Sequence, residues 1–285
     1  MFDAQLMKTV VAAALAEDAP SGDITSTLVI PAEAQATAVL AAREPGVFAG
    51  ADVFAAAFTL TDPSVTVELL KHDGDSFVAG DQLARVSGPA RAVLTGERVG
   101  LNFAQRMSGI ATLTHQYVDA IKGTNAVILD TRKTTPTLRA FERHAVVCGG
   151  GTNHRFSLSD AFMAKDNHLA VLTEGGLDIT QALRHVKAQL PAGMVFEVEV
   201  DRLDQIEDVL AGGVDVIMLD NFSLEDLRTG VAQVAGRAKV EASGGVNLST
   251  VTGIASTGVD YISVGALTHS ARALDLGLDV TIATR

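Results

Sequence analysis

The stretch DTRKTTPTLRAFERHAVVCGGGTNHRFSLSDAFMAKDNH, residues 130–168, follows one apolar run and contains another, and each run ends in charged residues. The run 126–129 leads into Asp130, and the run 161–164 leads into Lys165. A glycine-rich loop at 149–151 lies between them. Buried strands that end in basic groups, beside such a loop, are how a β/α barrel builds a pocket for an anion.

The charge distribution supports an anion site in this part of the chain. Residues 98–168 contain nine Lys or Arg and five Asp or Glu, while the remainder of this protein of net charge −12 has a balance of −16. A positive segment in an acidic protein indicates a negatively charged ligand. The alternative is a set of surface ion pairs on helices, which the position of several basic residues at strand ends disfavours.

Composition excludes several classes of function. The pI near 4.9 and the absence of Trp argue against a nucleic-acid partner. No run of 18 apolar residues is present, so we expect no membrane partner. Cys148 is the single cysteine, which excludes an internal disulfide and favours the cytoplasm. It follows two valines and is a weak candidate for a nucleophile.

From residue 126 onward, apolar runs recur and predict a parallel sheet. The residues that follow the runs are Asp130, Lys165, Glu199, Asp220, Ser243 and Gly265, and the last three intervals of 21, 23 and 22 residues suit strand, helix and two loops. Helical stretches are expected at 178–189, 204–211, 224–234 and 248–256. We predict an α/β fold with an incomplete (β/α) barrel. A doubly wound sheet is disfavoured because no GxGxxG follows the first strand.

The chain before residue 126 mixes both kinds of element. Helices are expected at 3–17, 51–58 and 90–121, the last with a break at Gly109, and strands at 36–43 and 65–71. The last helix carries polar residues, among them Arg98, that face a partner or a site, or else form a stripe exposed to the solvent.

The turns after the last two expected strands are rich in small residues. They comprise Ser243, Gly244 and Gly245, and Val264, Gly265 and Ala266. Exposed backbone N–H groups, with a helix expected after each turn, predict a phosphate site. The alternative is a pair of tight turns without a ligand.

Two carboxylates end the middle strands. Glu199 and Asp220 can hold Mg²⁺ or sugar hydroxyls. Glu197 points to the same side of its strand as Glu199, because side chains alternate along a strand. The alternative role for these acids is a buried ion pair with Lys165 or Arg132.

These residues, taken together, resemble one family. The sequence is similar to quinolinate phosphoribosyltransferase, also called nicotinate-nucleotide pyrophosphorylase (carboxylating). The motifs that carry the resemblance are SGDIT at 21–25, QRMSGIAT at 105–112, DTRKT at 130–134, GGGTNHR at 149–155, KDNH at 165–168, EVEVD at 197–201, LDN at 219–221, SGG at 243–245 and VGALTH at 264–269. One departure is Val147, where the family pattern has a basic residue.

The resemblance implies a reaction and an architecture. Quinolinate and phosphoribosyl pyrophosphate give nicotinate mononucleotide, pyrophosphate and CO₂ with Mg²⁺. The implied domains are an N-terminal α+β open sandwich at 1–112, a barrel at 113–268, and a C-terminal segment at 269–285 that packs back on the first domain. The implied assembly is a homodimer, or a higher oligomer built from dimers, with shared sites.

The resemblance also implies roles for individual residues. Lys133, Lys165, Glu199 and Asp220 are the expected catalytic residues. Arg98 is expected to come from the neighbouring subunit, and Thr131 to lie at the substrate site. Arg132, His154, Arg155 and Lys165 would hold the quinolinate carboxylates. Lys133, Glu199 and Asp220 would serve pyrophosphate, ribose and Mg²⁺, and the two small-residue turns would hold the 5′-phosphate.

Three alternatives stay open at the level of sequence. A molybdenum-transport-associated relative would share the fold. A Schiff-base aldolase would use Lys165, since a lysine at a barrel strand end is typical of that class. A phosphosugar-binding protein without enzymatic activity would bind ligand but release no pyrophosphate.

Overall fold

The computed structural model describes residues 3–174, 176 and 178–283, and the chain forms two compact units. Unit 1 comprises the chain up to His115, residues 135–150 and the chain from Ser270 onward. Unit 2 comprises residues 116–134 and 151–269. Among the described residues, no helix combines the length and the apolarity that a membrane crossing requires.

Unit 1 is built on an antiparallel sheet whose strand order is β12-β1-β5-β3. The strands are β1 (Gln35–Ala42), β3 (Thr66–Leu69), β5 (Gln82–Pro89) and β12 (Leu276–Ala283). Strand β12 pairs with β1 along its whole length, so the C-terminal segment completes the sheet as predicted. A separate two-stranded sheet joins β2 (Gly46–Val47) to β4 (Ser76–Phe77).

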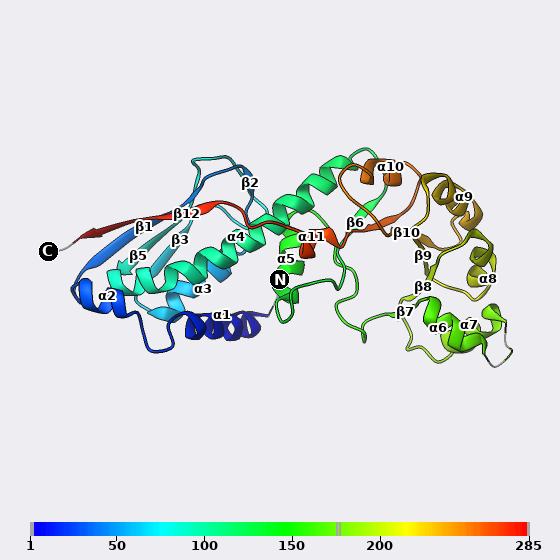
Figure 1. Ribbon diagram of the computed structural model, residues 1–285, viewed down its shortest axis with the longest axis horizontal. Coiled ribbons are helices and arrows are strands. Elements are labelled where there is room, and N and C mark those ends of the chain that lie inside the picture. The colour runs from blue at the N-terminus through cyan, green and yellow to red at the C-terminus, as the bar shows by residue number, and fades with distance from the viewer. Residues whose placement is uncertain (1–2, 175, 177, 284–285) are drawn as a thin grey trace. The chain divides into compact units, whose positions relative to one another are not determined.

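Five helices accompany this sheet, and Figure 1 shows α3 and α4 running along it. They are α1 (Ala4–Asp18), α2 (Ile24–Val29), α3 (Ala51–Thr61), α4 (Ala90–Ala120) and α5 (Arg139–Cys148). Asp3 caps α1 by accepting a hydrogen bond from the Gln5 N–H at 2.9 Å. The predicted break of α4 at Gly109 is wrong, because the helix is continuous there. A Cβ at Gly109 would lie 1.9 Å from the Arg272 carbonyl oxygen, so the glycine permits close packing.

Unit 2 is an open parallel sheet of six strands in the order β6-β11-β10-β9-β8-β7. The strands are β6 (Val127–Leu129), β7 (Phe162–Ala164), β8 (Phe196–Val200), β9 (Val216–Asp220), β10 (Lys239–Ser243) and β11 (Tyr261–Ser263). Strands β6 and β7 are the edges of this sheet, which confirms the incomplete barrel.

Helices follow the strands around the outside of unit 2 (Figure 1). They are α6 (Asp166–Thr173), α7 (Ile179–Lys187), the 3₁₀ turn η1 (Leu203–Gln205), α8 (Ile206–Ala211), α9 (Leu224–Val234), α10 (Val251–Ala255) and α11 (Ala266–His269). The helix expected at 248–256 is shorter than predicted. Asn247 accepts the Ser249 N–H at 2.9 Å and donates its own N–H to Thr250, and this local turn delays the helix.

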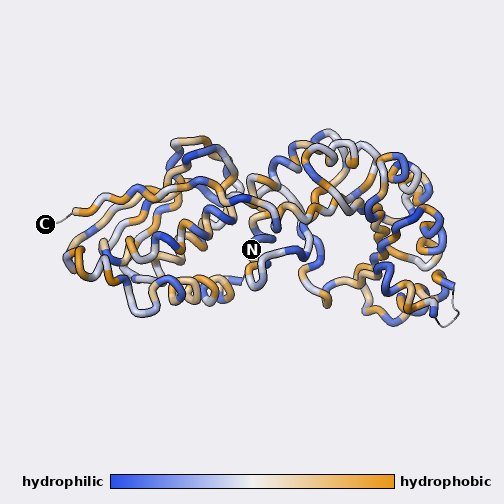
Figure 2. The backbone as a smooth tube through the Cα atoms, viewed as in Figure 1, coloured by the Kyte–Doolittle hydropathy of each residue, from blue (hydrophilic) through white to orange (hydrophobic). Residues whose placement is uncertain are grey.

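The alternation of side chains along β8 separates core from site. Phe196, Val198 and Val200 are almost fully buried. Glu197 and Glu199 alternate with them and point to the opposite side of the strand. The hydrophobic and hydrophilic residues along the chain can be followed in Figure 2. One face of each strand therefore builds the core with the helices, and the other face is free for polar chemistry.

Candidate active site

A cavity of about 580 Å³ lies at the carboxyl ends of the strands of unit 2. Ten of the predicted site residues line it: Thr131, Arg132, Lys133, His154, Arg155, Lys165, Asp220, Ser243, Gly244 and Gly245. They come from the ends of β9 and β10, from the loops after β6, β7 and β10, and from the 151–155 loop. The tertiary structure thus brings basic groups that are far apart in sequence into one cavity.

The loop after β6 supplies two of the cations. Arg132 and Lys133 follow Asp130, and the Lys133 N–H donates to the Thr131 hydroxyl at 3.2 Å. The Nε atom of Arg132 is buried and has no hydrogen-bond partner among the described residues. A buried donor without a partner is costly, so this atom marks a place where an anionic ligand gains a hydrogen bond.

Arg155 is held from its other side by β7. Its guanidinium donates to the Ala161 carbonyl at 3.2 Å and lies 3.3 Å from the Met163 sulfur. Burial and the nearby Arg132 guanidinium lower the pKa of Arg155 from its ordinary value. Two guanidinium groups that repel each other in a shared cavity favour an anion between them.

His154 lies deeper, among buried acids. Its backbone N–H donates to Asp130 at 2.8 Å, and its Nε2 is 3.3 Å from both Glu197 and Glu241. Burial lowers the pKa of His154, whereas the hydrogen bonds and charges of the two carboxylates raise it, and the net shift is upward. Burial raises the pKa of Glu197. The Ser263 hydroxyl donates to Glu241 at 2.5 Å.

Lys165 forms an ion pair with Glu199. Glu199 therefore forms the ion pair with Lys165 that was its alternative role, although this pair is only partly buried, and Glu199 is not among the residues that line the cavity. The Lys165 side chain keeps 45% of its surface exposed, so its ammonium can still meet a substrate. The ion pair engages the same nitrogen that a Schiff-base aldolase would use as its nucleophile.

Asp220 and the turn after β10 form one side of the cavity. The Asn221 amide donates to Asp220 at 2.6 Å, and the Asn221 N–H donates to the Ser243 carbonyl at 2.9 Å. Gly244 has a φ of 89°, and a Cβ there would lie 2.2 Å from the Asn221 Oδ1 atom. Only glycine suits this position, because the backbone approaches Asn221 closely and has a positive φ.

The second small-residue turn, unlike the turn at 243–245, lies outside the lining of the cavity. It comprises Val264, Gly265 and Ala266. The Thr268 hydroxyl donates to the Lys133 carbonyl at 2.7 Å, and a Cβ at Gly265 would lie 3.1 Å from the Lys133 side chain. This turn packs against the loop that carries Lys133. A helix follows each turn as expected, α11 from Ala266 and α10 from Val251.

Two residues considered from the sequence lie in unit 1. Arg98 is exposed on α4 and makes no hydrogen bond or ion pair within the described part of the chain. Cys148 is at the end of α5, where burial and the nearby Asp73 raise its pKa to about 12. Such a thiol is inert at neutral pH, in agreement with the prediction.

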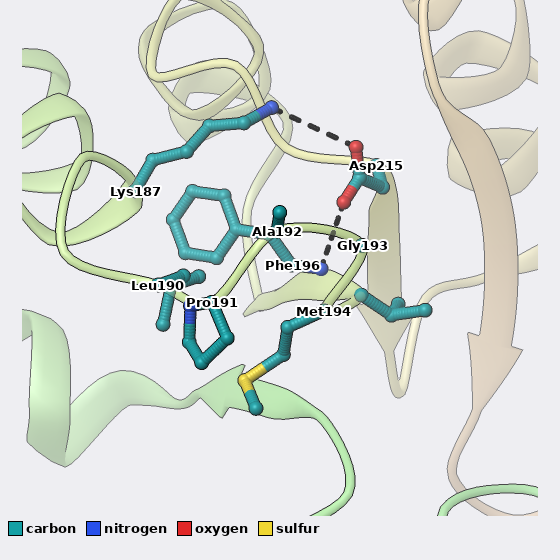
Figure 3. Close-up of a pocket in the computed structure, with 9 residues that line it drawn as sticks. Lys187, Leu190, Pro191, Ala192, Gly193, Met194, Phe196 and Asp215 are labelled. Atoms are coloured by element: carbon teal, nitrogen blue, oxygen red, sulfur yellow. Dashed lines mark hydrogen bonds and ion pairs between the residues drawn. The ribbon is translucent and has the colours of Figure 1, made fainter.

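A second hollow lies at the opposite, amino-terminal end of β8 and β9 (Figure 3). Asp215 accepts the Phe196 N–H at 2.8 Å and lies 3.6 Å from the Lys187 ammonium. The rest of the hollow is lined mainly by a loop of apolar and small residues, 190–195. The charges here are paired with each other, which is typical of a contact that fixes a loop.

The donor set near Asp220 suits Mg²⁺ only in part. Asp220 and Glu199 offer the oxygen ligands that Mg²⁺ prefers. Neither belongs to a group of three or more possible metal ligands among the described residues. Mg²⁺ commonly binds through one or two carboxylates and substrate phosphates, so these residues fit an ion that arrives with a phosphorylated substrate.

Five of the residues that line the cavity have no role predicted from the sequence. The same is true of the buried Glu241. The five are Asp130, Met163, Met218, Asn221 and Ser263. A signal for three of these six was available, because side chains two apart on a strand share a face. Met163 precedes Lys165 by two, Met218 precedes Asp220, and Glu241 precedes Ser243.

Comparisons with known proteins agree with this geometry. Residues 23–108 match the N-terminal domain of quinolinate phosphoribosyl transferase, and residues 110–279 match its C-terminal domain. The nicotinate-nucleotide pyrophosphorylase (carboxylating) of Mycobacterium leprae is 43% identical over 288 residues, which cover 98% of both chains.

Solved structures resemble the chain over its whole length. NadC from Streptococcus pyogenes has a TM-score of 0.94 at 41% identity and covers 100% of this chain and 99% of its own. The nicotinate-nucleotide pyrophosphorylase of Francisella tularensis has a TM-score of 0.92 at 36% identity, covering 99% and 98%. With two matching domains and these relatives, the chain belongs to the quinolinate phosphoribosyltransferase family.

Proposed function

We propose that this protein transfers the phosphoribosyl group of phosphoribosyl pyrophosphate to quinolinate, giving nicotinate mononucleotide, pyrophosphate and CO₂ for NAD biosynthesis. The observation that carries the proposal is the unpartnered, buried Nε of Arg132 in a cavity that it shares with Lys133, Arg155 and Lys165. A dianionic ring acid beside a pyrophosphate supplies the negative charge that such a cavity needs.

The proposed roles follow from position in the cavity. Arg132 and Arg155 offer planar forks to the quinolinate carboxylates, with Lys165 as a third cation and His154 beneath them. Lys133 faces the pyrophosphate. Asp220, supported by Glu199 behind Lys165, meets the ribose. The backbone of the turn 243–245 takes the 5′-phosphate, and the 264–266 turn supports the Lys133 loop from behind.

The chemistry asks little of the protein beyond binding and charge. The pyridine nitrogen attacks C1 of the ribose as pyrophosphate leaves, and nearby carboxylates favour the oxocarbenium-like transition state. The alkylated ring nitrogen is then cationic. When the C2–carboxylate bond breaks, the electron pair stays on C2, stabilised by that cation, and CO₂ departs. A proton then forms the C2–H bond.

We propose Mg²⁺ as the cofactor. Asp220 would hold the ion with the phosphorylated substrate, and Glu199, which pairs with Lys165, would contribute indirectly. When bound, the ion would neutralise charge that develops on the leaving pyrophosphate. A cytoplasmic location belongs to the same proposal and rests on the single cysteine.

We further propose a homodimer in which Arg98 completes the cavity of the partner. The support is the exposure of Arg98 and its lack of an ion pair within the described residues. An Arg98→Ala protein mixed with an Arg132→Ala protein should regain activity, since each hybrid dimer contains one intact site. A mixture as inactive as its components would reject the shared site.

The reaction itself is tested by pyrophosphate release. With phosphoribosyl pyrophosphate and Mg²⁺, quinolinate should release pyrophosphate and CO₂ in equal amounts. Nicotinate, which lacks the 2-carboxylate, should release little of either product. Equal turnover of both acids, or binding without any release, would reject the proposal in favour of another transferase or of a binding protein.

A further inference from the structure

Two buried acids beneath the cavity have no part in the roles proposed above. Glu197 and Glu241 are 2% and 1% exposed and come from β8 and β10, which flank β9 in the sheet. Their carboxylates converge on the Nε2 atom of His154, at 3.3 Å each. Burying two acids is costly, so their retention at one atom calls for a reason.

The other ring nitrogen of His154 contacts the main chain of the next residue. Its Nδ1 accepts the Arg155 N–H at 2.7 Å. The carboxylates attract a proton to Nε2, and the 2.7 Å contact requires Nδ1 to carry none, so the geometry selects the neutral ring with its proton on Nε2. The ring is therefore tied at one edge to the acids and at the other to Arg155.

We propose that Glu197 and Glu241 are positioning residues that hold the Nε2 proton of His154, and that the ring in turn orients Arg155 toward a carboxylate of the substrate. Asp130 supports the same arrangement, because it accepts the His154 backbone N–H at 2.8 Å. Ser263 fixes one of the acids through its 2.5 Å hydrogen bond to Glu241. Glu197, Glu241, Asp130 and Ser263 together fix the position of His154 beneath the proposed carboxylate pocket.

A metal ion is the competing explanation, because the three side chains could ligate one. A metal at Nε2 would displace the proton and demand a protonated Nδ1. Such an Nδ1–H would oppose the Arg155 N–H at 2.7 Å. The geometry therefore favours the proton. In the described chain, the buried Oε1 atom of Glu197 has no hydrogen-bond partner.

The inference rests on the proposed role of Arg155, and a double-mutant cycle separates the two. Glu241→Gln and Glu197→Gln should each raise KM for quinolinate by about 10-fold to 100-fold, since a displacement near 1 Å at a reacting group has effects of this size. KM for phosphoribosyl pyrophosphate should change much less. Calorimetric titration with quinolinate alone should show the same loss of affinity.

In an Arg155→Ala background, Glu241→Gln should add almost nothing, because the acids act through Arg155. Additive effects, or an unchanged KM in both glutamine variants, would overturn the inference while leaving the proposed function intact. An Arg155→Ala protein with normal quinolinate affinity would reject both this inference and the proposed role of Arg155. Asp215→Asn, at the amino-terminal end of β9, is the matched control and should leave both KM values unchanged.

A spectroscopic readout separates positioning from stability. In ¹⁵N-histidine-labelled protein, the His154 Nε2–H should give a protected proton signal that is lost in Glu241→Gln. If that variant does not fold, Ser263→Ala loosens the same acid without removing it and should raise KM for quinolinate by a smaller factor. One equivalent of a divalent metal that co-purifies with the wild type but not with Glu241→Gln would overturn the proposal.

Discussion

The two ends of the barrel strands in unit 2 use charged residues in opposite ways. At the amino-terminal end, Asp215 pairs with Lys187, and Asp260 pairs with Lys239 at 2.6 Å while accepting the Val240 N–H at 2.9 Å. At the carboxyl-terminal end, basic groups gather around a cavity and Arg132 keeps a donor without a partner among the described residues.

The difference separates charges that stabilise the fold from charges that are available to a ligand. The amino-terminal pairs satisfy each other and hold loops to the strands, so mutation there should change stability and not activity. The carboxyl-terminal cations repel one another, and a bound anion relieves the repulsion. Variants at the two ends should therefore differ in which property they change.

The largest difference in activity is expected between variants of two lysines, one at each end of the strands. Lys165→Ala should reduce kcat/KM for quinolinate by about 10³-fold or more, because the substrate carboxylate and Glu199 both lose their cationic partner. Lys187→Ala, in the same unit, should stay within about twofold of wild type. Steady-state kinetics, with thermal melting to verify folding, decide the comparison. A comparable loss of activity in Lys187→Ala would break it.

A smaller effect is expected from the turn after β10. Gly244→Ala must accommodate a Cβ 2.2 Å from Asn221 at a φ of 89°. We expect about a tenfold rise in KM for phosphoribosyl pyrophosphate, from a cost of about 1–3 kcal/mol for the strained backbone.

The control for strain alone is Gly236→Ala. Gly236 has a φ of 74°, and a Cβ added there would meet no atom within 4 Å, so its substitution should lower the melting temperature without changing KM. If both variants shift KM equally, the close approach of Gly244 to Asn221 has no part in phosphate binding.

A change in stability alone is expected at the amino-terminal end. Asp215→Ala leaves the Phe196 N–H without its acceptor and Lys187 without its partner. The melting temperature should fall by about 2–4 °C, as expected for the loss of about 1 kcal/mol in a protein of this size. Turnover at 25 °C should not change. A variant that melts normally but is inactive would contradict the assignment.

The smallest effect concerns Lys239. Its hydrogen bond to Asp260 raises the pKa of this lysine above its ordinary value of 10.5. A raised pKa means that the stabilisation is fully present below the unfolded value and is lost as pH rises through the folded one. The stability difference between wild type and Lys239→Met should be constant near neutral pH and should shrink above about pH 10.5. Added salt should shrink it further.

The expected elements were found where local patterns are strong. The helix expected at 224–234 has those bounds, and the strand ends at Lys165, Asp220 and Ser243 meet around one cavity. Features that depend on partners distant in the sequence cannot be predicted from local patterns. The Gly109 break is wrong because the Arg272 backbone packs against that glycine, and no pattern within the helix reports a residue so far along the chain.

The class of fold, the family and the carboxyl-end location of the cavity all follow from the amino-acid sequence alone. Side-chain alternation, strand-end residues and short motifs are all local, so a single chain reveals them. The partner of each charged group, in contrast, depends on how the chain folds. The tertiary structure committed Glu199 to Lys165, brought Glu197 and Glu241 to His154, and set the 264–266 turn against Lys133. Those contacts depend on the order of strands in the sheet, which joins residues that no local pattern connects.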